Sequence, residues 1–65
     1  MEIFPRITVE ADKCGGKPCI RGHRLTVEHV LKLLAEGSTP QELQQEWDFL
    51  ESDDIRAALK HGGRP

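Results

Sequence analysis

Two cysteines and a histidine lie close together in the first half of the chain, at Cys14, Cys19 and His23. Thiolates and imidazoles are preferred zinc ligands, but a structural zinc site needs four of them. Here His29 or a carboxylate would have to supply the fourth. The alternative, which we favour, is that both cysteines are small, reduced and partly buried side chains. We therefore expect no metal, no other cofactor and no disulfide.

The run Gly15-Gly16-Lys17 is similar to the end of a phosphate-binding loop. The full pattern needs a first glycine five residues earlier and a hydroxyl after the lysine. Ala11 and Pro18 occupy those two positions, and the proline also lacks an N–H that could bind phosphate. A chain of this size can hardly enclose a water-excluding pocket. We expect neither nucleotide binding nor catalysis.

Charge is unevenly distributed along the sequence. Residues 1–26 have a net charge of +2 and residues 27–65 a net charge of −4. The segment 13–27 contains four basic residues and no acid, so it could contact phosphates or an acidic partner. It could equally be a solvated loop. Its candidate nucleic-acid contacts are Lys17, Arg21 and Arg24.

The 65 residues, 37% of them hydrophobic, are enough for one small domain over 1–65. No apolar run is long enough to span a membrane, and the N-terminus does not have the pattern of a signal peptide. We therefore expect a cytoplasmic protein. Because small domains often gain stability by association, we also expect a homodimer.

Residues 1–25 are predicted to form a short β and loop element. The β-branched run 7–9 and the pair Cys19-Ile20 are predicted strands, separated by a turn region over 12–18 that is rich in glycine and ends in proline. Strands this short must pack against other elements to be stable.

Three helices are predicted over 26–61. The first has Thr26 as its N-cap, apolar residues at helical spacing over 27–34, and Gly37 after its end. The second begins with the capping-box sequence TPQE, residues 39–42, and ends near Trp47 or Asp48.

The third helix is predicted to start after Ser52 as its cap. Its apolar face would be Ile55, Ala58 and Leu59, and Gly62-Gly63 would end it, leaving 62–65 as a tail. A mostly α fold of three short helices is typical of the helix-turn-helix class, in which the third helix is the recognition candidate.

Arg56 and Lys60 are four residues apart on this third helix and could contact a base edge and a phosphate. Asp53 and Asp54 in its first turn would oppose phosphates. The alternative is that Asp53 pairs with Arg56 on a solvated face.

Trp47 and Phe49 belong to the largest apolar cluster, and Phe4 lies in a second apolar run. All three are candidate partner contacts, since tryptophan and other aromatic residues are favoured at binding hot spots. The alternative for the Trp47 cluster is a core position between the second and third helices.

Three separated blocks resemble the DUF433 family. They are CGGKPCIRGHRLTV at 14–27, AEGSTPQEL at 35–43 and DIRAAL at 54–59, and the resemblance covers roughly residues 5–61. His23, Asp48 and Glu51 depart from the family pattern. The resemblance implies a three-helix homeodomain-like fold in a cytosolic prokaryotic protein. It also implies an antitoxin-type autoregulator that pairs with a small toxin, often a PIN-like ribonuclease, and represses its own operon. The alternative is a protein-interaction adaptor that does not bind DNA.

Overall fold

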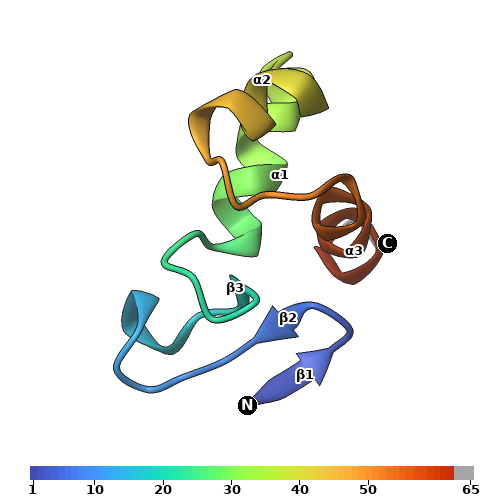
Figure 1. Ribbon diagram of the computed structural model, residues 1–65. Helices are drawn as coiled ribbons and strands as arrows, with labels where there is room; N and C mark the ends of the chain where they lie inside the picture. The colour runs from blue at the N-terminus through green and yellow to red at the C-terminus, as the bar shows by residue number, and fades with distance from the viewer. Residues whose placement is uncertain (63–65) are drawn as a thin grey trace.

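The computed structural model describes residues 1–62 and has a small sheet followed by three helices (Figure 1). The elements are β1 (Glu2–Phe4), β2 (Ile7–Thr8), a 3-10 turn (Cys14–Gly16), β3 (Cys19–Ile20), α1 (Val27–Ala35), α2 (Pro40–Glu46) and α3 (Ser52–Gly62). The expected mostly α architecture with a short β element at its start is therefore confirmed.

The three strands form one antiparallel sheet in the order β1-β2-β3. Ile7 on β2 is paired with Ile20 on β3, and both side chains are fully buried. The two predicted strands are thus present, although β2 ends at Thr8 rather than at residue 9. Strand β1 was not predicted, because three residues are too few to show an alternating pattern.

The first two helices begin as their sequences predict. The Thr26 hydroxyl accepts a hydrogen bond from the backbone N–H of His29 at 3.0 Å. Thr39 and Glu42 form a reciprocal capping box with bonds of 3.2 and 2.8 Å. Gly37 has φ of +105° and ends α1, which is a backbone conformation that other residues rarely adopt.

The predicted bounds of α3 differ from the observed ones by one residue at each end. Ser52 is the first residue of the helix rather than its cap, and the backbone N–H of Glu51 donates to the Asp54 carboxylate at 2.9 Å. Gly62 belongs to the helix and is its last described residue, rather than the first residue of the tail. A Cβ at Gly62 would collide with the side chain of Leu31, so glycine here allows α3 to approach α1 closely. The remaining predicted tail, 63–65, lies outside the described residues.

The prediction of the apolar face of α3 was also partly wrong. Ile55 and Ala58 are buried as predicted, but Leu59 is 48% exposed and Ala57 is buried in its place. Helix α3 packs mainly against α1. The buried arc of the helix is therefore centred on the residues that face α1.

The core lies between the sheet and the helices. Its buried side chains come from β2, β3, all three helices and the loops before α1 and α3: Ile7, Ile20, Leu25, Val27, Val30, Leu43, Leu50, Ile55, Ala57 and Ala58. Within residues 1–62, each helix is too short or too polar to traverse a lipid bilayer.

Candidate functional site

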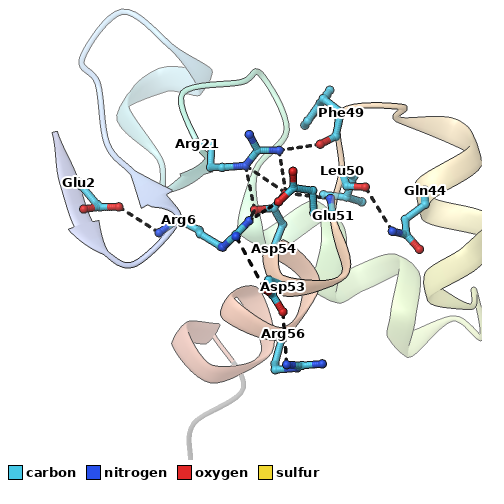
Figure 2. A network of polar contacts seen from close by, with 10 residues as sticks. All are labelled: Glu2, Arg6, Arg21, Gln44, Phe49, Leu50, Glu51, Asp53, Asp54 and Arg56. Carbon is cyan, nitrogen blue, oxygen red and sulfur yellow. Dashed lines mark hydrogen bonds and ion pairs between the residues drawn. The ribbon is translucent and has the colours of Figure 1, made fainter.

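A buried carboxylate, that of Asp54, lies where the sheet meets the start of α3 (Figure 2). The Asp54 side chain is completely buried, and two guanidinium groups contact it. Arg21 donates from Nε at 2.9 Å to Oδ1 and from Nη2 at 2.9 Å to Oδ2. Arg6 donates from Nη1 to Oδ1, also at 2.9 Å. We call Arg6, Arg21 and Asp54 the arginine–aspartate cluster.

The cluster joins four separate parts of the chain. Arg21 also donates to the carbonyl oxygen of Phe49 at 2.6 Å, and Arg6 also pairs with Glu51 at 2.7 Å. Arg6, which follows β1, and Arg21, which follows β3, both have positive φ, at 70° and 41°. Such a conformation is uncommon for a non-glycine residue, so the surrounding contacts must hold it in place. The cluster fixes the orientation of α3 relative to the sheet.

All three side chains of the arginine–aspartate cluster are stabilised in their charged forms. Burial alone would raise the pKa of Asp54. Hydrogen bonds from Arg21, from the Glu51 N–H and from Arg6 outweigh that effect and lower the pKa below its ordinary value. Hydrogen bonds to the Glu51 and Asp54 carboxylates raise the pKa of Arg6, and those to Asp54 raise the pKa of Arg21. Asp54 is thus an anion whose charge two arginines compensate.

The structure places the predicted nucleic-acid contacts in different local environments. Arg21 is bound within the arginine–aspartate cluster, and Lys17 pairs with Glu28 on α1 at 3.3 Å. Arg24 is exposed in the loop before α1. Arg56 and Lys60 line a groove of about 280 Å³ together with Phe4 and Arg6. Two of the three basic candidates of the segment 13–27 are therefore already paired with carboxylates of this chain.

The outer face of α3 presents one continuous exposed arc. Its exposed side chains are Ser52, Asp53, Arg56, Leu59 and Lys60. Arg56 has its side chain 67% exposed and pairs with Asp53 at 3.3 Å, as the alternative interpretation of these residues expected. An ion pair this exposed contributes little to stability, and Arg56 can exchange Asp53 for another anion.

The predicted partner contacts are partly buried aromatic residues that pack against the core. Phe49 stacks on His23 with ring centroids 3.8 Å apart. Trp47 contacts His29 edge-on at 5.4 Å, and Phe4 contacts His61 in the same way at 5.5 Å. Core packing thus accounts for part of each ring, and each retains an exposed part.

Both cysteines are free thiols. The Cys19 Sγ lies 3.3 Å from the carbonyl oxygen of Lys17, and burial together with the nearby Cys14 raises the pKa of Cys19 to about 11. A thiol with so high a pKa is a poor nucleophile. Within residues 1–62, no three or more His, Cys, Asp or Glu side chains are arranged to hold a metal ion.

Arg6 was the residue of the cluster that sequence reasoning did not single out, and Asp54 was interpreted only as a first-turn carboxylate that would oppose phosphates. The spacing of Glu51 and Asp54, which is that of a capping box, was the one local signal available. The pairing of Asp54 with Arg6 and Arg21, 48 and 33 residues away, has no local signature.

Comparison with known proteins gives one family and one solved structure. The family model described as "Protein of unknown function (DUF433)" matches residues 7–61. A crystal structure of a DUF433 member protein from Anabaena variabilis is similar, with a TM-score of 0.82 and 27% sequence identity over 86% of this chain. The match spans 55% of that protein's length. No curated protein gives a significant match. By its matched residues and its fold, the chain belongs to the DUF433 family.

Proposed function

We propose that this protein is a cytoplasmic, non-catalytic autoregulator of the antitoxin type. As a homodimer it binds the operator of its own operon through α3, and it neutralises a protein toxin, a PIN-like ribonuclease. The observation that carries the DNA-binding half is the outer face of α3, where Arg56 and Lys60 are exposed on the helix that follows a turn. This is the position of the recognition helix in helix-turn-helix proteins.

The arginine–aspartate cluster supports this proposal by removing an electrostatic obstacle. Two carboxylates in the first turn of α3 would repel the phosphates that this end of a recognition helix approaches. Asp54 is buried and its charge is compensated by Arg6 and Arg21. Asp53, which stays exposed in that turn, pairs with Arg56 at 3.3 Å and with Arg6 at 3.7 Å, so its charge is partly compensated. The helix start is therefore less repulsive than its sequence indicates.

A specific observation favours a second candidate, a protein-interaction adaptor that does not bind DNA. Three of the five basic candidates, Lys17, Arg21 and Arg56, already pair with carboxylates of this chain. The exposed residues of α2 include Glu42 and Glu46 but no lysine or arginine. In a helix-turn-helix complex the helix before the recognition helix crosses the DNA backbone, where acidic side chains are unfavourable.

Fluorescence anisotropy with labelled DNA tests the proposal against the adaptor. The protein is titrated into its own upstream duplex and into a scrambled duplex, at roughly 50 and 200 mM salt. The autoregulator should bind the upstream duplex preferentially and lose affinity steeply as salt rises, because each neutralised phosphate releases counterions. Absence of binding at both salt concentrations would reject DNA recognition by this protein and leave the adaptor.

A further inference from the structure

A groove of about 390 Å³ lies between α1 and α2. Helix α1 contributes His29 and Leu33 to its lining, and α2 contributes Leu43 and Glu46. Trp47, the residue that ends α2, completes the apolar floor. Figure 1 shows α2 beside the end of α1, away from the sheet. None of the described residues that line the groove belongs to α3, so the groove is separate from the outer face of that helix.

The floor of the groove is apolar and already in place. Leu43 is 2% exposed, and Leu33 and Trp47 are partly buried against the core. The Trp47 ring contacts the ring of His29 edge-on, with an interplanar angle of 81°. Large aromatic rings that are held in position and half exposed are typical anchors of protein interfaces. A partner side chain can bury itself here without first rearranging the floor.

The rim of the groove is acidic. Glu42 is held beside it by the hydrogen bond that its Oε1 accepts from the Thr39 N–H, and Glu46 is exposed on the next turn of α2. The whole segment 33–50 contains four acidic residues and no lysine or arginine. Lys32 precedes this segment on α1, so the acidic side of the groove is the α2 side, where Glu42 and Glu46 attract cationic groups.

We propose that this groove binds a segment of a partner protein in which a large apolar side chain is flanked by lysine or arginine. The apolar side chain would lie on Trp47 and Leu33, and the flanking cations would face Glu42 and Glu46. This inference deepens the partner-binding half of the proposed function and identifies the chemistry of that partner.

The charge of the groove argues against two other occupants. Nucleic acid would bring phosphates next to Glu42 and Glu46, which repel them. A second copy meeting this groove across a two-fold axis would place glutamates opposite glutamates. A second copy inserting its basic loop instead would make a head-to-tail contact, which continues into a chain of molecules unless it happens to close into a ring.

The test uses short synthetic peptides and the intrinsic fluorescence of Trp47, the only tryptophan in the chain. The probe peptide has two leucines flanked on both sides by lysine and arginine. One control peptide has the same leucines flanked by glutamate, and another has the same cations around glycine. Binding of the probe alone should shift the Trp47 emission saturably, because the leucines would displace water from the ring.

Charge variants of the full-length protein identify the site. Glu46→Lys should weaken probe binding about fivefold or more. It removes the ion pair between Glu46 and a cation of the peptide and puts a like charge in its place. Glu42→Gln should weaken it less and keep the capping box, which accepts glutamine in place of glutamate. The matched control is Asp12→Lys, an equal charge change in the loop before Cys14–Gly16, which lies at the far end of the molecule from α2 (Figure 1). It should leave probe affinity unchanged.

Three results would overturn the inference. The glutamate-flanked peptide could bind as well as the probe, Asp12→Lys could weaken binding as much as Glu46→Lys, or no peptide could change the Trp47 emission. A Trp47 emission that shifts with protein concentration alone, together with dimer formation in analytical ultracentrifugation that Glu46→Lys abolishes, would assign the groove to a second copy instead. None of these results depends on DNA binding, so failure here is distinguishable from failure of the α3 interface.

Discussion

Arg21 donates two nearly parallel hydrogen bonds to the carboxylate of Asp54, from Nε and Nη2 at 2.9 Å each, across 33 residues of sequence (Figure 2). The pair joins the loop after β3 to the first turn of α3. Bidentate contacts of this kind fix orientation as well as distance. The short sheet therefore has a defined role, which is to hold α3 in place from one end.

Replacing the buried carboxylate should strongly destabilise the fold. We expect Asp54→Ala to lower the free energy of unfolding by about 3 kcal/mol, because it leaves the Arg21 and Arg6 guanidinium groups and the Glu51 N–H without their acceptor. The total free energy of unfolding of a domain of this size is roughly 3–10 kcal/mol, so this variant would lose a large share of it. Urea denaturation followed by far-UV circular dichroism measures the change.

Asp53→Ala is the matched control, one residue away on the same helix. Its carboxylate is exposed and pairs with Arg56 at 3.3 Å and with Arg6 at 3.7 Å, and exposed pairs contribute little, so the change should be within about 0.5 kcal/mol. Equal losses in the two variants would show that the arginine–aspartate cluster does not organise the fold.

Stability should fall at acid pH because of the same carboxylate. The pKa of Asp54 in the folded protein lies below its ordinary value of 3.8, so the folded state binds fewer protons than the unfolded state. This contribution is complete above pH 3.8 and is lost as the pH falls through the lowered folded-state pKa. Urea denaturation measures the free energy of unfolding at about pH 5 and at about pH 3. Its decrease between the two pH values should be smaller in Asp54→Asn than in the wild type. A loss of the same size in both would assign the acid sensitivity to other carboxylates.

Local sequence signals predicted those elements whose determinants lie within a few residues. The Thr26 cap, the Thr39–Glu42 capping box and the Gly37 helix end all depend on contacts between near neighbours, and all are present. The strands β2 and β3 were predicted because both runs are short, apolar and separated by a turn, but their antiparallel pairing was not.

The features that could not be predicted depend on contacts between distant residues. A glycine at position 62 is typical of a helix end. Its role in the fold is to make room for the Leu31 side chain of α1, which the local sequence does not show. Arg21 belonged to a basic segment and was interpreted as a DNA contact. Only the fold brings it to Asp54, where its charge is used within the chain. Charge patterns along a sequence do not distinguish a free cation from a paired one.

The two cysteines should differ in reactivity. Cys19 is 2% exposed with its pKa raised to about 11, whereas Cys14 is partly exposed in the 3-10 turn. At pH 8, iodoacetamide should alkylate Cys14 first and modify Cys19 at a measurable rate only in denaturant, because the thiolate is the reacting species. Peptide mass spectrometry locates the modification. Similar rates at both sites in the folded protein would contradict the burial of Cys19.

The proposed contact of α3 with DNA can be tested through the salt dependence of binding. Arg56→Ala and Lys60→Ala should each weaken binding to the upstream duplex, and each should reduce the slope of log affinity against log salt by about 0.9 if the side chain contacts a phosphate. If Arg56 contacts a base edge instead, its loss should also reduce the preference for the upstream over the scrambled duplex by about 1–3 kcal/mol.

Asp53→Asn is the informative companion in the same titration. It removes the exposed carboxylate next to Arg56, which frees that arginine and reduces repulsion of phosphates, so binding should become tighter rather than weaker. Arg24→Ala, in the exposed loop before α1, tests whether the basic loop contributes a separate contact. If Arg56→Ala, Lys60→Ala and Asp53→Asn all leave the affinity unchanged while Arg24→Ala abolishes it, the DNA-binding surface is the loop and α3 is a scaffold helix.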